Sequence, residues 1–318
     1  MHLRISLPTE LADAVLRVLQ DDPAVSSLTH VRGASVKPPG DVIEADVARE
    51  ATNDVVDRLR ELRVQECGSV SVERVGAWMS RSGYDAARLT PGSGADSVVW
   101  ADVAHRAYEE SELNWTYASF MTLATMIAGI AIVLDSQILV IGAMVLGPEF
   151  GPISALGVAL VRRRGTLFRL AGRTLVLGFV IAIAVTTLAA LVGRALGWVQ
   201  VSAVTADRPA TGFIYTPDKW SFIVAIIAAA AGVLSLTSAR VGGLSGVFIS
   251  VTTVPAAGNI ALALAFGVGS EIRGSSLQLL VNVSGMVLAG WFTLTVQQVV
   301  WSRVSAYRAR LLARRARA

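Results

Sequence analysis

Long apolar runs dominate the pattern of hydrophobic and polar positions from about residue 115 onward. A helix needs about 20 residues to cross the hydrocarbon core of a bilayer, and six runs come close to or exceed that length. They cover residues 117–134, 138–161, 170–192, 220–238, 241–266 and 275–300. We therefore predict an all-α membrane domain of six spans over residues 115–302, followed by a basic tail over residues 303–318.

The first 75 residues show the shorter periodicities of a soluble domain instead. Period-two alternation predicts strands, and apolar positions three and four apart predict helices. The predicted strands are 2–7, 24–34, 41–48 and 67–75, and the predicted helices are 9–20 and 51–62. This order is typical of a ferredoxin-like βαββαβ sandwich, so we expect an α+β cytoplasmic domain over residues 1–79. Such a domain either binds a small ligand or partner through its open sheet face or serves as a cap.

Residues 80–114 connect the two regions. The segment 80–97 contains Pro91-Gly92-Ser93-Gly94 and is predicted to be a flexible linker. After it, Val99, Val103 and Ala107 lie on one side of a predicted amphipathic helix whose other side is acidic. That juxtamembrane helix either lies against the membrane or a partner subunit, or packs on its own protein.

Charged residues separate these regions further. Residues 1–114 hold 12 Lys and Arg against 19 Asp and Glu, a net charge of −7, whereas residues 115–318 hold 16 against 5, a net charge of +11. In the second region most basic residues lie in the 162–173 connection and in the tail. The positive-inside rule therefore places both termini in the cytoplasm of a bacterial inner membrane. Since these charges lie at the ends of apolar runs, we expect a lipid bilayer and no nucleic acid as a partner.

Residue types that carry catalytic and metal chemistry are scarce. Cys67 is the one cysteine, and the three histidines lie in the first 105 residues without the spacing of metal ligands. The membrane region contains no histidine or cysteine and five acidic residues. We predict no catalytic residue, no metal and no cofactor, and we expect that the protein is not an enzyme.

The most informative motif interrupts two of the six apolar runs. Residues 148–153 and 255–260 both have the pattern Pro-x-x-Gly-x-Ile. Proline removes a backbone donor and clashes with the preceding turn, so each stretch should break or strongly kink its helix inside the bilayer. The broken segments either cross the membrane or re-enter on the same side. Backbone groups freed at the breaks must face protein or a watery cavity.

The two breaks also point to an internal repeat. They lie 107 residues apart, and Ala128-Gly129 in the first span matches Ala231-Gly232 in the fourth. Spans one to three would then correspond to spans four to six in an inverted 3+3 repeat, because each unit has an odd number of crossings. Inverted repeats with paired broken helices are typical of transporters with a site near the midplane. The alternative is that the kinks and small residues merely aid helix packing.

The breaks supply the candidate site residues. Prolines suit the first turn of a restarting half-helix, and Glu149 is the carboxylate predicted deepest in the membrane, where ionisable groups are functional candidates by default. Polar residues near the second break and on the sixth span would complete the site. The candidates are Pro148, Glu149, Gly151, Pro152, Pro255, Gly258, Asn259, Gln278 and Asn282.

Alternatives to a transport role remain for several of these residues. Glu149 could instead lie in a water-filled vestibule, or pair with Arg162 or Arg163 of another subunit, for structure alone. Gln278 and Asn282 share a helix face and could form interhelical hydrogen bonds. No basic residue is predicted near the midplane, which favours protons, cations or neutral solutes.

Together these features resemble a known membrane family. The ferredoxin-like front, Gly142-Ala143-Met144 with the following Gly-Pro-x-x-Gly-Pro segment, and the Val-Pro break at 254–255 are similar to the bacterial and archaeal family called domain of unknown function 389. The resemblance implies an integral inner-membrane protein with a cytoplasmic domain and assigns no substrate. Glu149 departs from the family pattern, which commonly has apolar residues between its two Gly-Pro pairs.

These observations lead to one functional expectation and one alternative. We expect a transporter or channel for a small solute or ion that acts through the two broken helices. We also expect a homo-oligomer, because the spans are rich in glycine and alanine and the sheet has an open face. The alternative is a membrane-anchored sensor or scaffold, whose N-terminal domain binds a ligand or partner.

Overall fold

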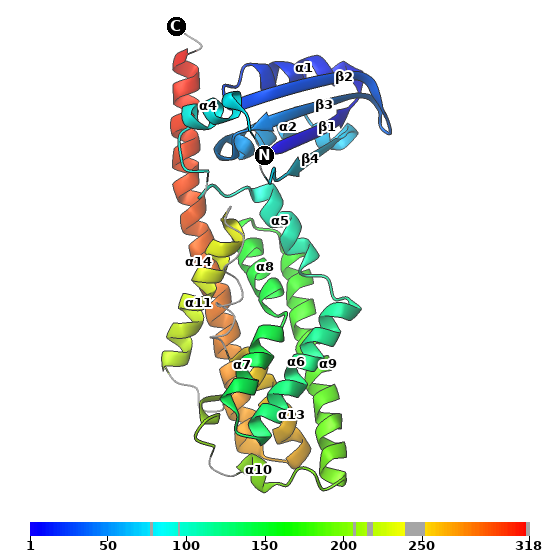
Figure 1. Cartoon of the computed structure of the whole chain (residues 1–318), viewed down its shortest axis with the longest axis vertical. Coiled ribbons are helices and arrows are strands. Elements are labelled where there is room, and N and C mark those ends of the chain that lie inside the picture. Colours follow the sequence, from blue (N-terminus) through cyan, green and yellow to red (C-terminus); the bar gives the residue numbers. More distant parts are fainter. Residues whose placement is uncertain (77–78, 95, 206–207, 215–218, 239–251, 316–318) are drawn as a thin grey trace. The chain divides into compact units, whose positions relative to one another are not determined.

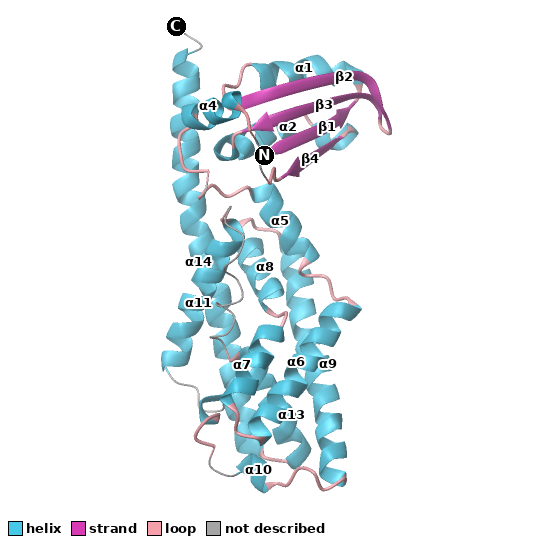
Figure 2. Cartoon of the chain, in the orientation of Figure 1, coloured by secondary structure: helices cyan, strands magenta, loops and turns pink. Residues whose placement is uncertain are grey.

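The computed structural model describes residues 1–76, 79–94, 96–205, 208–214, 219–238 and 252–315 (Figure 1). The chain forms two compact units. The first contains Met1–Val103, Thr237–Arg240 and Gln297–Ala318, and the second contains Ala104–Leu236 and Val241–Val296. All described strands belong to the first unit, and the second unit is helical (Figure 2).

The first unit is built on a four-stranded antiparallel sheet, as predicted. Its strands are β1 (His2–Leu7), β2 (Val25–Val36), β3 (Pro39–Val47) and β4 (Ser69–Glu73), in the order β2-β3-β1-β4. The helices between them are α1 (Thr9–Gln20), the 3-10 turn η1 (Arg49–Ala51), α2 (Thr52–Glu61) and α3 (Val64–Cys67). β1 pairs with β3 through Ile5 and Ile43 and with β4 through Ile5 and Val70.

Alternating residues explain where the core of this unit lies. Leu3, Ile5 and Leu7 of β1 are fully buried, because every second side chain of a strand points to the same face. Val15 of α1 and Val55 of α2 belong to the same apolar cluster. Both helices therefore cover one face of the sheet, and each fully buried aliphatic side chain contributes about 1.5–3 kcal/mol.

The segment predicted as a flexible linker contains a helix. α4 (Arg81–Leu89) begins after Ser80, whose hydroxyl accepts a hydrogen bond from the Gly83 amide at 3.1 Å. Prediction of a linker from the later Pro91-Gly92-Ser93-Gly94 run overlooked this serine cap, which satisfies an otherwise unpaired amide at the helix start. α5 (Trp100–Glu109) follows where the amphipathic helix was expected.

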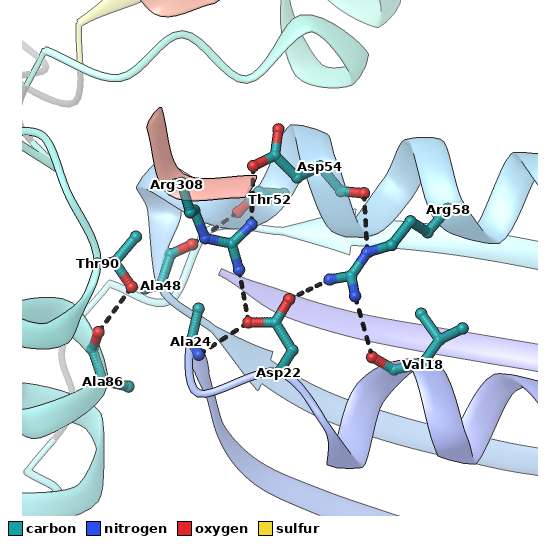
Figure 3. Close-up of polar contacts among 10 residues, drawn as sticks. All are labelled: Val18, Asp22, Ala24, Ala48, Thr52, Asp54, Arg58, Ala86, Thr90 and Arg308. Atoms are coloured by element: carbon teal, nitrogen blue, oxygen red, sulfur yellow. Dashed lines mark hydrogen bonds and ion pairs between the residues drawn. The ribbon is translucent and has the colours of Figure 1, made fainter. Parts of the chain in front are cut away.

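The C-terminal tail is also helical and supplies a buried arginine to the first unit. α14 (Gly269–Arg315) continues from the last apolar run into the tail. Arg308 bonds Asp22 and, at 2.7 Å, Asp54, and Arg58 bonds the other oxygen of Asp22 (Figure 3). Burial alone would raise the pKa of Asp22, but the hydrogen bonds from Arg308 and the Ala24 amide and the charges of both arginines hold it below its ordinary value.

The second unit is a helical bundle with long apolar helices. Its helices, with the start of α14, are α6 (Trp115–Val133), α7 (Gln137–Leu146), α8 (Phe150–Val161), α9 (Gly165–Ala195), α10 (Ser202–Thr205), the 3-10 turn η2 (Gly212–Ile214), α11 (Lys219–Thr237) and α13 (Thr253–Phe266). α13 packs against α6 and α9 and is almost wholly buried, so it lies inside the described bundle.

Three described helices are long and apolar enough to cross a membrane, and a fourth crossing is possible if α7 and α8 form one bent span. The three are α6, α9 and α14, and two shorter apolar helices cover Phe222–Thr237 and Thr253–Phe266. These helices are those of a membrane-embedded protein. Residues 239–251, which include the start of the predicted fifth span, lie outside the described residues.

Candidate functional site

The first predicted break is present in the structure. α7 ends at Leu146 and α8 begins at Phe150, and the two helices are bent by 52°. Pro148 lies in the break itself, whereas Pro152 lies in the first turn of α8, where proline loses no intrahelical donor. Glu149 is the residue that precedes α8. Its carboxylate is therefore held beside the positive end of that helix.

The second motif also coincides with a helix start. α13 begins at Thr253 and contains Pro255 in its first turn. Both α8 and α13 thus carry proline at their third residue, Pro152 and Pro255. The half that would precede the second break falls in 239–251, outside the described residues.

The two helix starts meet at Glu149. Thr253 donates a hydrogen bond from Oγ1 to Glu149 Oε1 at 2.6 Å, although the two residues are 104 apart in sequence. Glu149 is 7% exposed, and within the described part of the chain its second oxygen, Oε2, has no hydrogen-bond partner. A Cβ added at Gly147 would collide with both Oε2 and Val254, so the first break packs directly on the second helix start.

Gln278 and Asn282 lie beside this contact, on α14. Their amide nitrogens donate to Thr252 Oγ1 at 3.1 and 2.9 Å, which ties α14 to the residue before α13. The two side chains are 0% and 1% exposed, and among the described residues Gln278 Oε1 and Asn282 Oδ1 have no partner. The structure thus brings both residues to the Thr252–Thr253 step, one residue away from the bond to Glu149.

Asn259 has different neighbours from those we expected. Its Nδ2 donates to Glu271 Oε2 at 3.0 Å and to Ser275 Oγ at 2.8 Å, and its Oδ1 accepts a hydrogen bond from Arg208 Nη1 at 3.1 Å. Arg208 also bonds Glu271 at 2.7 Å. Asn259 is therefore part of a buried ion-pair cluster.

The cluster contains two charged residues that the sequence analysis did not single out. Arg208 and Glu271 are 3% and 9% exposed, and Glu271 lies in the first turn of α14. Arg208 comes from an irregular segment before η2, which has no periodicity to indicate burial. A signal was present on α14, where Glu271, Ser275, Gln278 and Asn282 follow a 4-3-4 spacing and so share one helix face. At 1.5 Å per residue this polar stripe is about 16 Å long.

Glycines permit two close helix contacts near the site. A Cβ at Gly258 of α13 would lie 2.8 Å from Ala128 Cβ and 3.0 Å from the Gly129 amide nitrogen of α6. A Cβ at Gly232 of α11 would collide with the ring of Phe150, the first residue of α8. Each break helix thus packs against a small residue of one Ala-Gly pair singled out in the sequence.

A cavity of about 370 Å³ opens next to the first break. Gly147, Pro148 and Gly151 form part of its wall. Further wall residues are acidic and precede α6: Glu109, Glu110 and Glu112. Glu110 packs on the break, since a Cβ at Gly151 would lie 3.0 Å from Glu110 Cβ. Within the described ranges, no group of three or more His, Cys, Asp and Glu is placed to hold a metal ion.

Comparison with protein families matches residues 144–288 to the family described as Domain of unknown function (DUF389). The match confirms the resemblance inferred from the break motifs, and it covers every candidate site residue, from Pro148 to Asn282. Neither comparison with curated proteins nor comparison with solved structures gave a match. The family description names no activity, so the function must be argued from the geometry.

Proposed function

We propose that this protein is a transporter or channel that moves a small solute or ion through a site between the starts of α8 and α13. The observation that carries the proposal is the 2.6 Å hydrogen bond between Thr253 and Glu149, which joins the starts of α13 and α8. An inert membrane anchor needs neither two interrupted helices nor a carboxylate between them. We propose no catalytic role.

The proposal includes six crossings arranged as an inverted 3+3 repeat. The reciprocal glycine contacts support it: α13 of the second half packs on Gly129 of the first half, and α8 of the first half packs on Gly232 of the second. Two halves related by a pseudo-two-fold axis would exchange contacts in this way. In this arrangement α7 with α8 forms span two, α11 forms span four, and α13 belongs to span five.

The membrane orientation follows from charge. The basic 162–173 connection and the basic tail favour the cytoplasmic side of a bacterial inner membrane for both termini. We further propose that the N-terminal unit is a ferredoxin-like βαββαβ domain, since its strand order, β2-β3-β1-β4, is that of a split βαβ sandwich. We also propose that the protein works as a homo-oligomer.

The decisive experiment is a flux assay on purified full-length protein in liposomes. Uptake of protons, monovalent and divalent cations and small neutral metabolites is measured for the wild type, Glu149→Gln and Thr253→Val. Both variants keep the side-chain volume, but the first removes the negative charge and the second removes the donor to Glu149. We expect a flux that each variant reduces at least about tenfold, which corresponds to about 1.4 kcal/mol.

Two matched variants control for general damage. Glu66→Gln changes an exposed carboxylate in the first unit, and Thr295→Val removes a hydroxyl that bonds only its own helix at Trp291 O. Both should transport like the wild type. If no solute in the screen moves, and Glu149→Gln changes neither stability nor cellular phenotype, then transport is the wrong function and the sensor or scaffold role takes its place.

A further inference from the structure

No positively charged side chain of the described residues bonds the carboxylate between the two helix starts. Glu149 is 7% exposed, and its one hydrogen-bond donor in the described structure is the neutral hydroxyl of Thr253. Burying an uncompensated ion costs several kcal/mol. The positive end of α8 offsets part of this cost, and a bound positive charge would offset more.

In the part of the chain that the structure describes, buried acceptor oxygens without partners lie on the side chains that bond Thr252 and Thr253. Glu149 Oε2, Gln278 Oε1 and Asn282 Oδ1 are buried acceptor oxygens without partners among the described residues. Their side chains bond Thr252 and Thr253, which are consecutive residues about 3.8 Å apart at Cα. Thr252 has one hydroxyl proton, so it can donate to one amide oxygen and must leave the other free. An unpaired buried acceptor costs about 1–3 kcal/mol, and a cation satisfies several at once.

The cavity nearest to Glu149 has the matching charge. The cavity beside the break carries Glu109, Glu110 and Glu112 on its wall and reaches Pro148 and Phe150, the residues on either side of Glu149 in the chain, whereas Glu149 itself does not line it. A concave surface with charges of one sign raises the local concentration of the opposite ion. α7 also ends at this place, and the last carbonyl groups of a helix carry partial negative charge.

We propose that the Glu149 site binds a dehydrated monovalent metal cation, with the acidic cavity as its entrance. One carboxylate balances one positive charge, and amide, hydroxyl and backbone carbonyl oxygens replace the hydration shell, as in other cation sites at broken helices. This inference rests on the proposed function, because it names the class of ion that the site between α8 and α13 would take.

Cation binding to the full-length protein in detergent tests the inference apart from flux. Lithium, sodium, potassium, rubidium, caesium, magnesium and calcium chlorides are each titrated against N-methylglucamine chloride at constant ionic strength, with the thermal unfolding midpoint and calorimetric heat as readouts. We expect at least one cation to raise the midpoint in a saturable manner, because a ligand that binds the folded state stabilises it. Glu149→Gln should weaken that cation's affinity at least about tenfold.

Two further comparisons keep the test decisive if Glu149→Gln folds poorly. Asn282→Leu should weaken affinity about threefold or more, whereas Gln298→Leu, also on α14, should not. Combined Glu109→Gln and Glu112→Gln changes should weaken affinity at low ionic strength and lose this effect in about 1 M salt, where the Debye length is near 3 Å.

Three results would overturn the inference: no monovalent cation shifts the midpoint, Glu149→Gln retains wild-type affinity, or magnesium or calcium alone saturates the site. Failure of the proposed function looks different. Saturable cation binding without flux of any solute would refute transport and leave the cation site standing, whereas flux that ignores monovalent cations would refute the cation site and leave transport standing.

Discussion

The contact between α13 and α6 allows one stability prediction to be worked from distances. A methyl group at Gly258 would lie 2.8 Å from Ala128 Cβ, 3.0 Å from the Gly129 nitrogen and 3.1 Å from the Thr125 carbonyl oxygen. Two of these three atoms are backbone atoms of α6, so no side-chain rotation can relieve the clash. Gly258→Ala must therefore separate two helices that are both fully buried at this point.

The size of the effect is a difference between two terms. Overpacking of a well-packed core costs about 1–3 kcal/mol, and replacement of glycine by alanine inside a helix returns about 0.8–1 kcal/mol. We expect a net loss of about 0–2 kcal/mol relative to the wild type, and of about 1–3 kcal/mol relative to a helical Gly→Ala change that causes no clash. For a chain unit of this size the second difference is about 2–12 °C in the unfolding midpoint.

The assay is thermal unfolding of full-length protein in mild detergent, followed by size exclusion. Gly142→Ala in α7 is the matched control, because a Cβ there meets no atom within 4 Å. The control should melt at or slightly above the wild-type temperature. A Gly258→Ala protein that melts as high as Gly142→Ala would contradict the close packing of α13 on α6 and, with it, the reciprocal contacts that support the repeat.

Two further predictions concern the first unit and the topology. Arg308→Ala should destabilise the full-length protein by about 1–3 kcal/mol in thermal unfolding, because Asp22 stays buried with fewer donors, whereas Arg310→Ala, at an exposed position, should not. Because folding lowers the pKa of Asp22, the ionised carboxylate stabilises the folded protein fully above the unfolded-state pKa near 4, and this stabilisation is lost as the pH falls through the folded-state pKa. A loss of stability on Arg308→Ala that is larger at pH 2 than at pH 6 would contradict this account. In intact cells an impermeant maleimide should label Trp198→Cys but reach the native Cys67, which is exposed in the structure, only after permeabilisation. Labelling of Cys67 without permeabilisation would refute the cytoplasmic placement of the N-terminus.

The sequence determined the features that depend on local chemistry and on whether a segment lies in water or in lipid. Period-two alternation and apolar stripes located the four strands and the first two helices, since these patterns follow directly from strand and helix geometry. Apolar length identified the membrane helices, and proline at 148 and 152 identified the bend between α7 and α8, because proline cannot continue a helix normally. The matched residues 144–288 contain both break motifs, the most specific of the features that carried the family resemblance.

Local rules were insufficient where capping or ion pairing decided the outcome. α4 was missed because the glycine-rich run after it predicted a linker, whereas the hydrogen bond from the Gly83 amide to Ser80 caps the start of a helix. The helical tail was missed because the sequence shows a basic run, and the burial of Arg308 depends on Asp22 and Asp54, more than 250 residues earlier. The burial of Arg208 was missed for the same reason, since its partners Asn259 and Glu271 are over 50 residues later.

The site itself combines both kinds of information. Residue types and spacing indicated Glu149, Gln278, Asn282 and the two helix starts, because polar groups inside apolar runs are costly and therefore stand out. Only the tertiary structure decided which of them meet: Thr253 bonds Glu149, Gln278 and Asn282 bond Thr252, and Asn259 bonds Arg208 and Glu271. Sequence spacing fixes neighbours along one helix, whereas contacts between helices depend on packing over the whole unit, such as the close approach of Gly258 to α6.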